Sequence, residues 1–171
     1  MRIFFILLIV SLTSCSKNID SALTDKELET KFSEHKLQYT QLREMITDDS
    51  KFLQKFKVGN DRLGEYQLYD KGWAKQYGYY VSFVRILSEY KLTQTRYLEY
   101  LNLLSVVGAS EIELYKGNVF VTLSSSGFVF GGCLSQIIYS PNNLKLERPS
   151  WAQVYYQAKL TDNWGGETKC N

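Results

Sequence analysis

The chain has 171 residues, of which 44% are hydrophobic and 22% are charged, a composition that supports a packed core and excludes a disordered protein. This length fits one compact domain and is too short for two full ones. The net charge of +2 gives no basic excess, so nucleic acid is not expected as a partner. One His, two Pro and three Cys leave little material for a metal site, and we expect no metal or other cofactor.

Residues 1–14 have the three-part build of a secretory signal peptide. Arg2 supplies positive charge, residues 3–10 are an unbroken apolar run, and residues 11–14 are mostly small and polar. A helix over residues 3–14 would extend about 18 Å, well short of the roughly 30 Å hydrocarbon core of a bilayer. The segment therefore predicts an export signal rather than a membrane span.

The junction Leu12-Thr13-Ser14-Cys15 resembles the lipobox of bacterial lipoproteins, in which a Leu stands three places before an invariant Cys. That resemblance implies cleavage before Cys15, a diacylglyceryl group on its thiol and an acyl chain such as palmitate on the new amine. Two or three chains hold a protein durably on a bilayer, at about 0.8 kcal/mol per buried CH₂. Ser16, rather than an Asp, follows the Cys, which is similar to the default outer-membrane sorting signal of Gram-negative bacteria. We therefore expect a lipid-anchored protein of the cell envelope, at the periplasmic face of the outer membrane; an ordinary cleaved signal with an accidental Cys is the alternative.

Residues 15–23 are mostly polar and predict a flexible tether with an r.m.s. reach of about 15 to 18 Å. Residues 24–171 show no internal repeat and no linker, and predict a single domain. Helical patterns come first and strand patterns later, which indicates the α+β class. We expect an N-terminal helix and a second helix packed on an antiparallel β-sheet, which is formed by a hairpin at 111–123 and the strands that follow it.

The first helix has a clear start. Thr24 and Glu27 form a capping box, and an apolar stripe at helical spacing runs to about Ile46. The only histidine, His35, lies on this stripe, where we expect a packed core residue. Any Ser-His or Cys-His nucleophile pair would have to use His35, so this placement argues against an enzyme.

The second helix begins after Thr93 or Thr95 and ends at Gly108, as its apolar spacing and the glycine indicate. Residues 51–76 contain turn signals but support no firm prediction. Residues 77–86 are rich in aromatic and β-branched side chains and favour a strand, while 81–90 also fit a helix.

Residues 111–123 alternate between polar and apolar about Gly117-Asn118, a two-residue hairpin turn signal. This turn pairs Leu114 with Val121 and places all the aliphatic pairs on one face. A slip of one residue would bury Glu113, so the pattern favours this register.

Later segments are less regular. Residues 128–139 predict a strand or a pair of strands with a bulge or tight bend at Gly131-Gly132. Residues 151–160 fit both a strand period and a helical stripe, and residues 161–163 predict a turn.

The order of these elements resembles that of small lipoproteins of Gram-negative bacteria, a resemblance that implies no particular activity. In that family an aromatic strand follows the final Trp, whereas residues 165–167 here are Gly-Gly-Glu, so we expect the last sheet edge to be missing or replaced. The segments that carry the resemblance are 42–48, 96–104, 112–123, 127–139 and 162–164.

Cys133 and Cys170 are the thiols that remain once Cys15 is lipidated, and export delivers them to an oxidising compartment. We expect a disulfide between them that closes a loop of about 37 residues; a buried Cys133 with an unpaired Cys170 is the alternative. Asp48-Asp49 could form a carboxylate dyad for glycan cleavage, but adjacent acids at a helix end are more typical of solvated residues.

Four aromatic residues, Trp73, Tyr77, Tyr79 and Tyr80, lie within eight positions. Tyr combines a large contact area with a polar tip suited to interfaces, so these residues are a candidate binding surface. The alternative is that the rings build the core of a small domain.

These features predict a membrane-anchored envelope lipoprotein that acts by binding or scaffolding rather than catalysis. The expected partners are the membrane, through the N-terminal lipid, and an envelope protein or a toxin. The alternative function is an immunity or inhibitor lipoprotein that blocks a toxin or a cell-wall-degrading enzyme. A hydrolase acting on wall material is a weaker third hypothesis.

Overall fold

The computed structural model describes residues 22–51, 53–126, 132–142 and 144–171. The expected signal peptide, Cys15 and most of the expected tether lie outside the described residues, as does Gly131 of the expected glycine bend. Within the described residues the fold has four helices and an antiparallel sheet of ten strands in the order β5-β4-β3-β2-β1-β6-β7-β8-β10-β9. The α+β prediction is confirmed.

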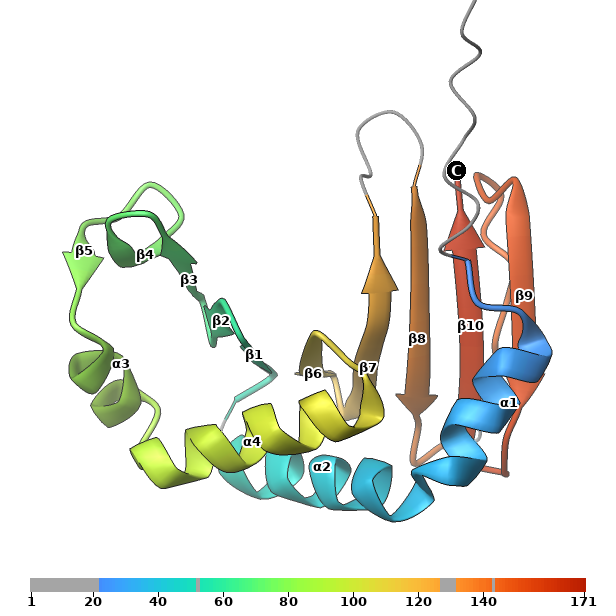
Figure 1. The fold of residues 1–171 in the computed structure, drawn as a ribbon, viewed down its shortest axis with the longest axis horizontal. Helices are drawn as coiled ribbons and strands as arrows, with labels where there is room; N and C mark the ends of the chain where they lie inside the picture. Colours follow the sequence, from blue (N-terminus) through green and yellow to red (C-terminus); the bar gives the residue numbers. More distant parts are fainter. Residues whose placement is uncertain (1–21, 52, 127–131, 143) are drawn as a thin grey trace, which may run out of the picture.

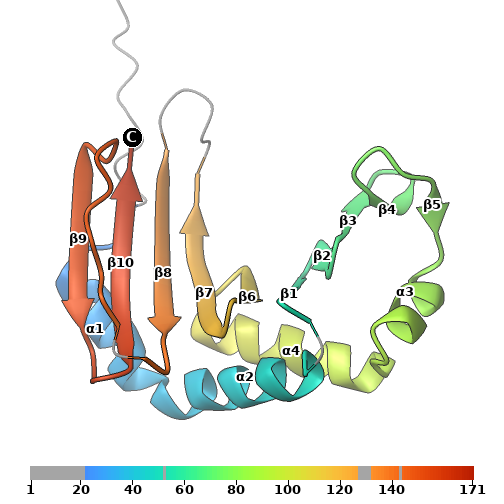
Figure 2. The ribbon, with the colours of Figure 1, turned by 180° about the vertical axis from the view of Figure 1, so that it is seen from behind.

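Figure 1 shows how the layers are arranged. Strands β7, β8, β10 and β9 form a wall at one end of the molecule, with α1 packed against it, and α2 and α4 lie together along one side. The other end is formed by β2 to β5 and α3, residues 62–89, which we call the arm; Figure 2 shows it from behind. In chain order the elements are α1 (Asp25–Glu34), α2 (Lys36–Asp49), β1 (Lys55–Gly59), β2 (Arg62–Leu63), β3 (Tyr66–Tyr69), β4 (Gly72–Lys75), β5 (Tyr80–Val81), α3 (Phe83–Glu89), α4 (Gln94–Val107), β6 (Glu111–Tyr115), β7 (Asn118–Ser125), β8 (Cys133–Tyr139), β9 (Val154–Lys159) and β10 (Trp164–Cys170).

The expected first helix is two helices. Thr24 caps α1 in a capping box with Glu27, as the sequence predicts, but the helix ends at Glu34 and α2 begins at Lys36. His35 stands at the break with φ −126° and ψ 25° and is only half-buried, so the core position expected for it is wrong. The break lets α1 pack on β9 and β10 while α2 packs on β6 and α4. The buried stripe nevertheless continues across both helices as Leu28, Phe32, Tyr39, Leu42, Met45 and Ile46.

Helix α4 ends at Gly108, as the sequence predicts, and begins after Thr93, one of the two starts that the sequence allowed. Thr93 is its N-cap, and its hydroxyl accepts a hydrogen bond from the Arg96 N–H at 3.0 Å. Gly108 ends the helix in the left-handed region at φ 66°, a conformation that glycine adopts without a Cβ penalty.

The hairpin of β6 and β7 differs from the predicted register by two residues. Leu114 pairs with Val119 rather than Val121, and the turn is Lys116-Gly117, with φ 49° and 80°. Both turn residues need positive φ because the turn is of the mirror-image type that matches strand twist. A shift of two keeps every side chain on its face, and Ile112, Leu114, Val119 and Val121 are buried as expected. Leu123 is only partly buried, because the strand is irregular between Thr122 and Ser124.

The last sheet edge was expected to be missing or replaced, and the strand after the final Trp is not missing, because β10 lies inside the sheet between β8 and β9. Gly165 and Gly166 let other segments approach it closely on opposite faces. A Cβ on Gly166 would lie 3.0 Å from the Cβ of Leu28 in α1, and one on Gly165 would lie 2.3 Å from Cδ2 of Leu144. The edge of the sheet is formed by β9 instead. Of the strand and the helix that the sequence allowed for residues 151–160, the strand is correct for most of the segment.

Leu23, assigned to the tether by the sequence, belongs to the folded domain. Its N–H donates to Ser135 Oγ at 3.3 Å, and its carbonyl accepts from Thr168 Oγ1 at 2.6 Å.

Candidate functional site

The structure separates the four aromatic residues of the candidate binding surface. Trp73 is half-buried and stacks on Phe83 with ring centroids 5.4 Å apart. Tyr77 and Tyr79 are 99% and 95% exposed, and Tyr80 is 52% exposed. The strand favoured for 77–86 is only β5, since α3 begins at Phe83. The two exposed tyrosines therefore lie in the turn between β4 and β5, and Trp73 belongs to the packing of the arm.

Exposed apolar side chains are concentrated on the arm. Among the described residues, half of the large hydrophobic side chains that are exposed fall between positions 68 and 84, while the other half are spread from position 37 to position 151. Concentrations of this kind mark interaction sites more often than single exposed residues do. The members on the arm are Leu68, Tyr69, Tyr77, Tyr79, Tyr80 and Val84.

A polar groove of about 690 Å³ lies along β1 to β4. Lys57, at its base, is held by Glu111 at 2.9 Å and Glu113 at 3.2 Å, and Lys55 is held by Glu113 at 3.3 Å. Burial opposes the charged form of Lys57, but the two carboxylates outweigh it and raise the pKa of Lys57 above its ordinary value. This part of the groove is therefore charge-balanced.

A second network closes the groove at the arm. Lys75 Nζ lies 3.0 Å from Glu65 and 3.1 Å from Glu89, over the ring of Tyr66 at 4.8 Å. The Tyr66 hydroxyl donates to Glu89 at 2.7 Å. This hydrogen bond, together with Lys75, holds the pKa of Glu89 below its ordinary value, so Glu89 stays charged and Lys75 is paired with carboxylates of this chain.

Arg62 is the cation of the groove lining that forms no ion pair with the residues that the structure describes. Its planar guanidinium can donate two parallel hydrogen bonds to a carboxylate or phosphate. The ring of Tyr69, 40% exposed, and the amides of Gln67 and Gln76 line the same groove. The arrangement can bind an acidic group beside an apolar or hydroxyl-bearing surface.

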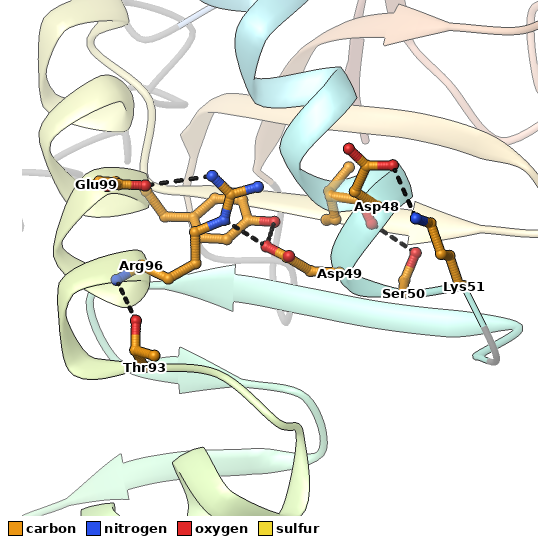
Figure 3. A network of polar contacts seen from close by, with 9 residues as sticks. Asp48, Asp49, Ser50, Lys51, Thr93, Arg96 and Glu99 are labelled. Carbon is orange, nitrogen blue, oxygen red and sulfur yellow. Dashed lines mark hydrogen bonds and ion pairs between the residues drawn. The ribbon is translucent and has the colours of Figure 1, made fainter.

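Asp48 and Asp49 do not act as a pair (Figure 3). Asp48 faces solvent with Lys51 at 3.5 Å, while Asp49 accepts hydrogen bonds from Arg96 Nε and the Tyr100 hydroxyl, each at 2.8 Å. Burial and this carboxylate raise the pKa of Tyr100 above its ordinary value. Asp49 therefore links α2 to α4. The prediction that both acids are solvated is wrong for Asp49.

The Sγ atoms of Cys133 and Cys170 form a disulfide at the end of β8 and β10, where these two residues are register partners. In the described part of the chain, no group of three or more His, Cys, Asp or Glu residues is placed to hold a metal ion. Over the same residues, no helix is both long and apolar enough to cross a membrane.

Comparison with known proteins adds no family to these observations. No protein-family model matches the chain, and neither a curated protein nor a solved structure matches it.

The groove was not predicted from the sequence, because its residues lie in the segment 51–76, for which the sequence supports no firm prediction. The nearest signal was the alternation of Lys55, Phe56, Lys57 and Val58, which places the two lysines on one face of a strand.

Proposed function

We propose that the protein is a lipid-anchored lipoprotein of the cell envelope that acts by binding a partner, and that the arm is its binding part. The Leu12-Thr13-Ser14-Cys15 junction supports the anchor. The observation that carries the binding role is the arm, which holds half of the exposed large apolar side chains of the described chain, and one of these, Tyr69, lines the polar groove. Binding sites combine concave shape, apolar surface and a few placed polar groups.

The charged side chains that line the groove indicate which chemical group the partner must present. Lys55, Lys57 and Lys75 are paired with carboxylates of this chain, whereas Arg62 has no ion pair among the described residues and can meet a charge from outside. The partner is an envelope protein that presents an acidic side chain to Arg62 and packs on Tyr69. Truncating one partner of a desolvated charge pair costs an interface about 2 to 5 kcal/mol, so Arg62 dominates the affinity.

A photo-crosslinking amino acid at Tyr69 tests the binding role in cells that make the protein. We expect one covalent adduct with an envelope protein, and its loss in Arg62→Gln because the acidic side chain no longer has a partner. The matched control is the same probe at Leu37, which is 80% exposed on α2. Equal adducts at the two positions, or an adduct that survives Arg62→Gln, would contradict the proposal.

The anchor is tested separately by mass spectrometry of the N-terminal peptide. We expect Cys15 as the first residue with its acyl chains attached, and release of Cys15→Ser from the membrane fraction. An intact leader or a bare thiol at Cys15 would overturn the anchor.

An immunity or inhibitor role uses the same exposed arm and differs in the partner. A toxin or a wall-degrading enzyme in the Tyr69 adduct would favour that role, and a resident envelope protein would favour scaffolding.

A further inference from the structure

We infer that the β4–β5 turn is a membrane contact, in which Tyr77 and Tyr79 enter the interfacial layer of the bilayer that holds the lipid anchor. The inference rests on the anchor proposed above. It assigns the tip of the arm to lipid and leaves the groove around Arg62 to the protein partner.

The turn holds both rings in solvent. Tyr77 and Tyr79 are 99% and 95% exposed, and the turn is closed by a hydrogen bond from the Gly78 N–H to the Lys75 carbonyl at 2.8 Å. Tyr77 has φ 60°, a left-handed conformation that is unfavourable for a bulky side chain. Tyr77 therefore occupies a backbone conformation that glycine or asparagine would adopt with less strain.

The turn lies on the same side of the molecule as the point where the chain enters the fold. Leu23 is bound to Ser135 and Thr168, two residues along β8 and β10 from the disulfide that marks the end of both strands. Figures 1 and 2 show this end, the C-terminus and the β4–β5 turn all directed away from α2 and α4. The end at which Leu23 is bound and the tip of the arm therefore face the same way.

The tether limits how far the domain can move from the bilayer. Between Cys15 and Ala22 the chain has only residues 16–21, and seven links span at most about 25 Å in any conformation. A contact that is weak on its own is strengthened when it becomes intramolecular in this way. Two tyrosine rings are then enough to fix the orientation of the arm.

Tyrosine suits this role because its ring partitions into the interfacial layer while its hydroxyl stays hydrated. The two rings lie at the tip of a turn, whereas the energetic centre of a protein interface is a closely packed, desolvated pocket. The contact is apolar rather than ionic, so it needs no anionic lipid and is insensitive to salt.

The test uses the mature lipidated protein, purified with its anchor and reconstituted into phosphatidylcholine vesicles with or without brominated acyl chains. In Tyr79→Trp, we expect the added emission to shift to shorter wavelength in plain vesicles and to be lost in brominated ones. The matched control is Tyr115→Trp, at a residue 41% exposed beside a different turn, with no shift and no loss. The unsubstituted protein supplies the background from Trp73, Trp151 and Trp164.

Equal quenching in the two variants, or an added emission that responds only when an envelope protein is supplied, would overturn the inference; the latter result would make the tip a protein contact. Mass spectrometry of the same preparation separates the two proposals. If Cys15 carries no lipid, the anchor has failed; if Cys15 is lipidated and the added tryptophan is unquenched, the membrane contact alone has failed. Replacing Tyr77 and Tyr79 by serine leaves the turn backbone able to form, and should abolish the protection of residues 76–81 from hydrogen exchange that vesicles confer.

Discussion

Replacing Gly166 by alanine measures how closely α1 packs on the sheet. The new Cβ would lie 3.0 Å from Cβ and 3.2 Å from Cδ1 of Leu28, whereas carbon atoms at optimal separation lie about 3.5 to 4.0 Å apart. Leu28 is fully buried, so α1 itself must move. Overpacking costs about 1 to 3 kcal/mol, against about 0.4 to 1 kcal/mol gained through the unfolded chain. We expect Gly166→Ala to lower the free energy of unfolding by about 1 to 2 kcal/mol.

Urea unfolding followed by tryptophan fluorescence measures this loss, and the melting temperature should fall by about 2 to 8 °C. The matched control is Leu28→Ala, alone and combined with Gly166→Ala. Truncating Leu28 removes the Cγ and Cδ1 contacts, so Gly166→Ala should cost less in that background, which a double-mutant cycle detects. A more stable Gly166→Ala protein, or strictly additive effects, would refute the close packing of α1 on β10.

Three further predictions concern the rest of the fold. Replacing Cys133 and Cys170 by serine should lower the free energy of unfolding by about 4 kcal/mol, since the disulfide closes a 37-residue loop; unchanged urea midpoints with and without reductant would contradict this. Tyr100→Phe removes a hydrogen bond to the carboxylate of Asp49 and should cost about 1.5 to 3 kcal/mol in urea unfolding, and an unaltered midpoint would show that Arg96 alone suffices. Burial raises the pKa of Tyr97 to about 12. The stability that Tyr97 contributes to the free energy of unfolding, about 3 kcal/mol, is therefore fully present below about pH 10 and is lost as the pH rises toward 12. Tyr97→Phe should flatten this alkaline decline in stability, and an equally steep decline in the variant would count against the argument.

The features that the sequence predicted correctly depend on neighbours in the chain. Thr24 with Glu27, Thr93 and Gly108 act through hydrogen bonds and backbone conformations within one turn, and such caps are readable from residue type and spacing. The buried face of the 111–123 hairpin follows from its period of two.

The candidate site was only partly readable. The aromatic cluster was identified, but the partial burial of Trp73 depends on α3, which supplies Phe83 as its stacking partner. The ion pairs of Lys57 and Lys75, the lysines that line the groove with Arg62, join β1 to β6 and β4 to α3, which are separate segments of the chain. Periodicity gives the face of a side chain, and only the folded arrangement gives its partner.

By itself, the sequence determined the class of fold, the caps, the apolar faces and the pair of cysteines available to each other, because each follows from local geometry or composition. The tertiary structure alone decided the break at His35, the two-residue shift of the hairpin and the place of β10 inside the sheet. In each case alternatives that satisfy the local pattern equally well were separated by contacts with distant segments, such as Leu28 on Gly166, whose energies no local window contains.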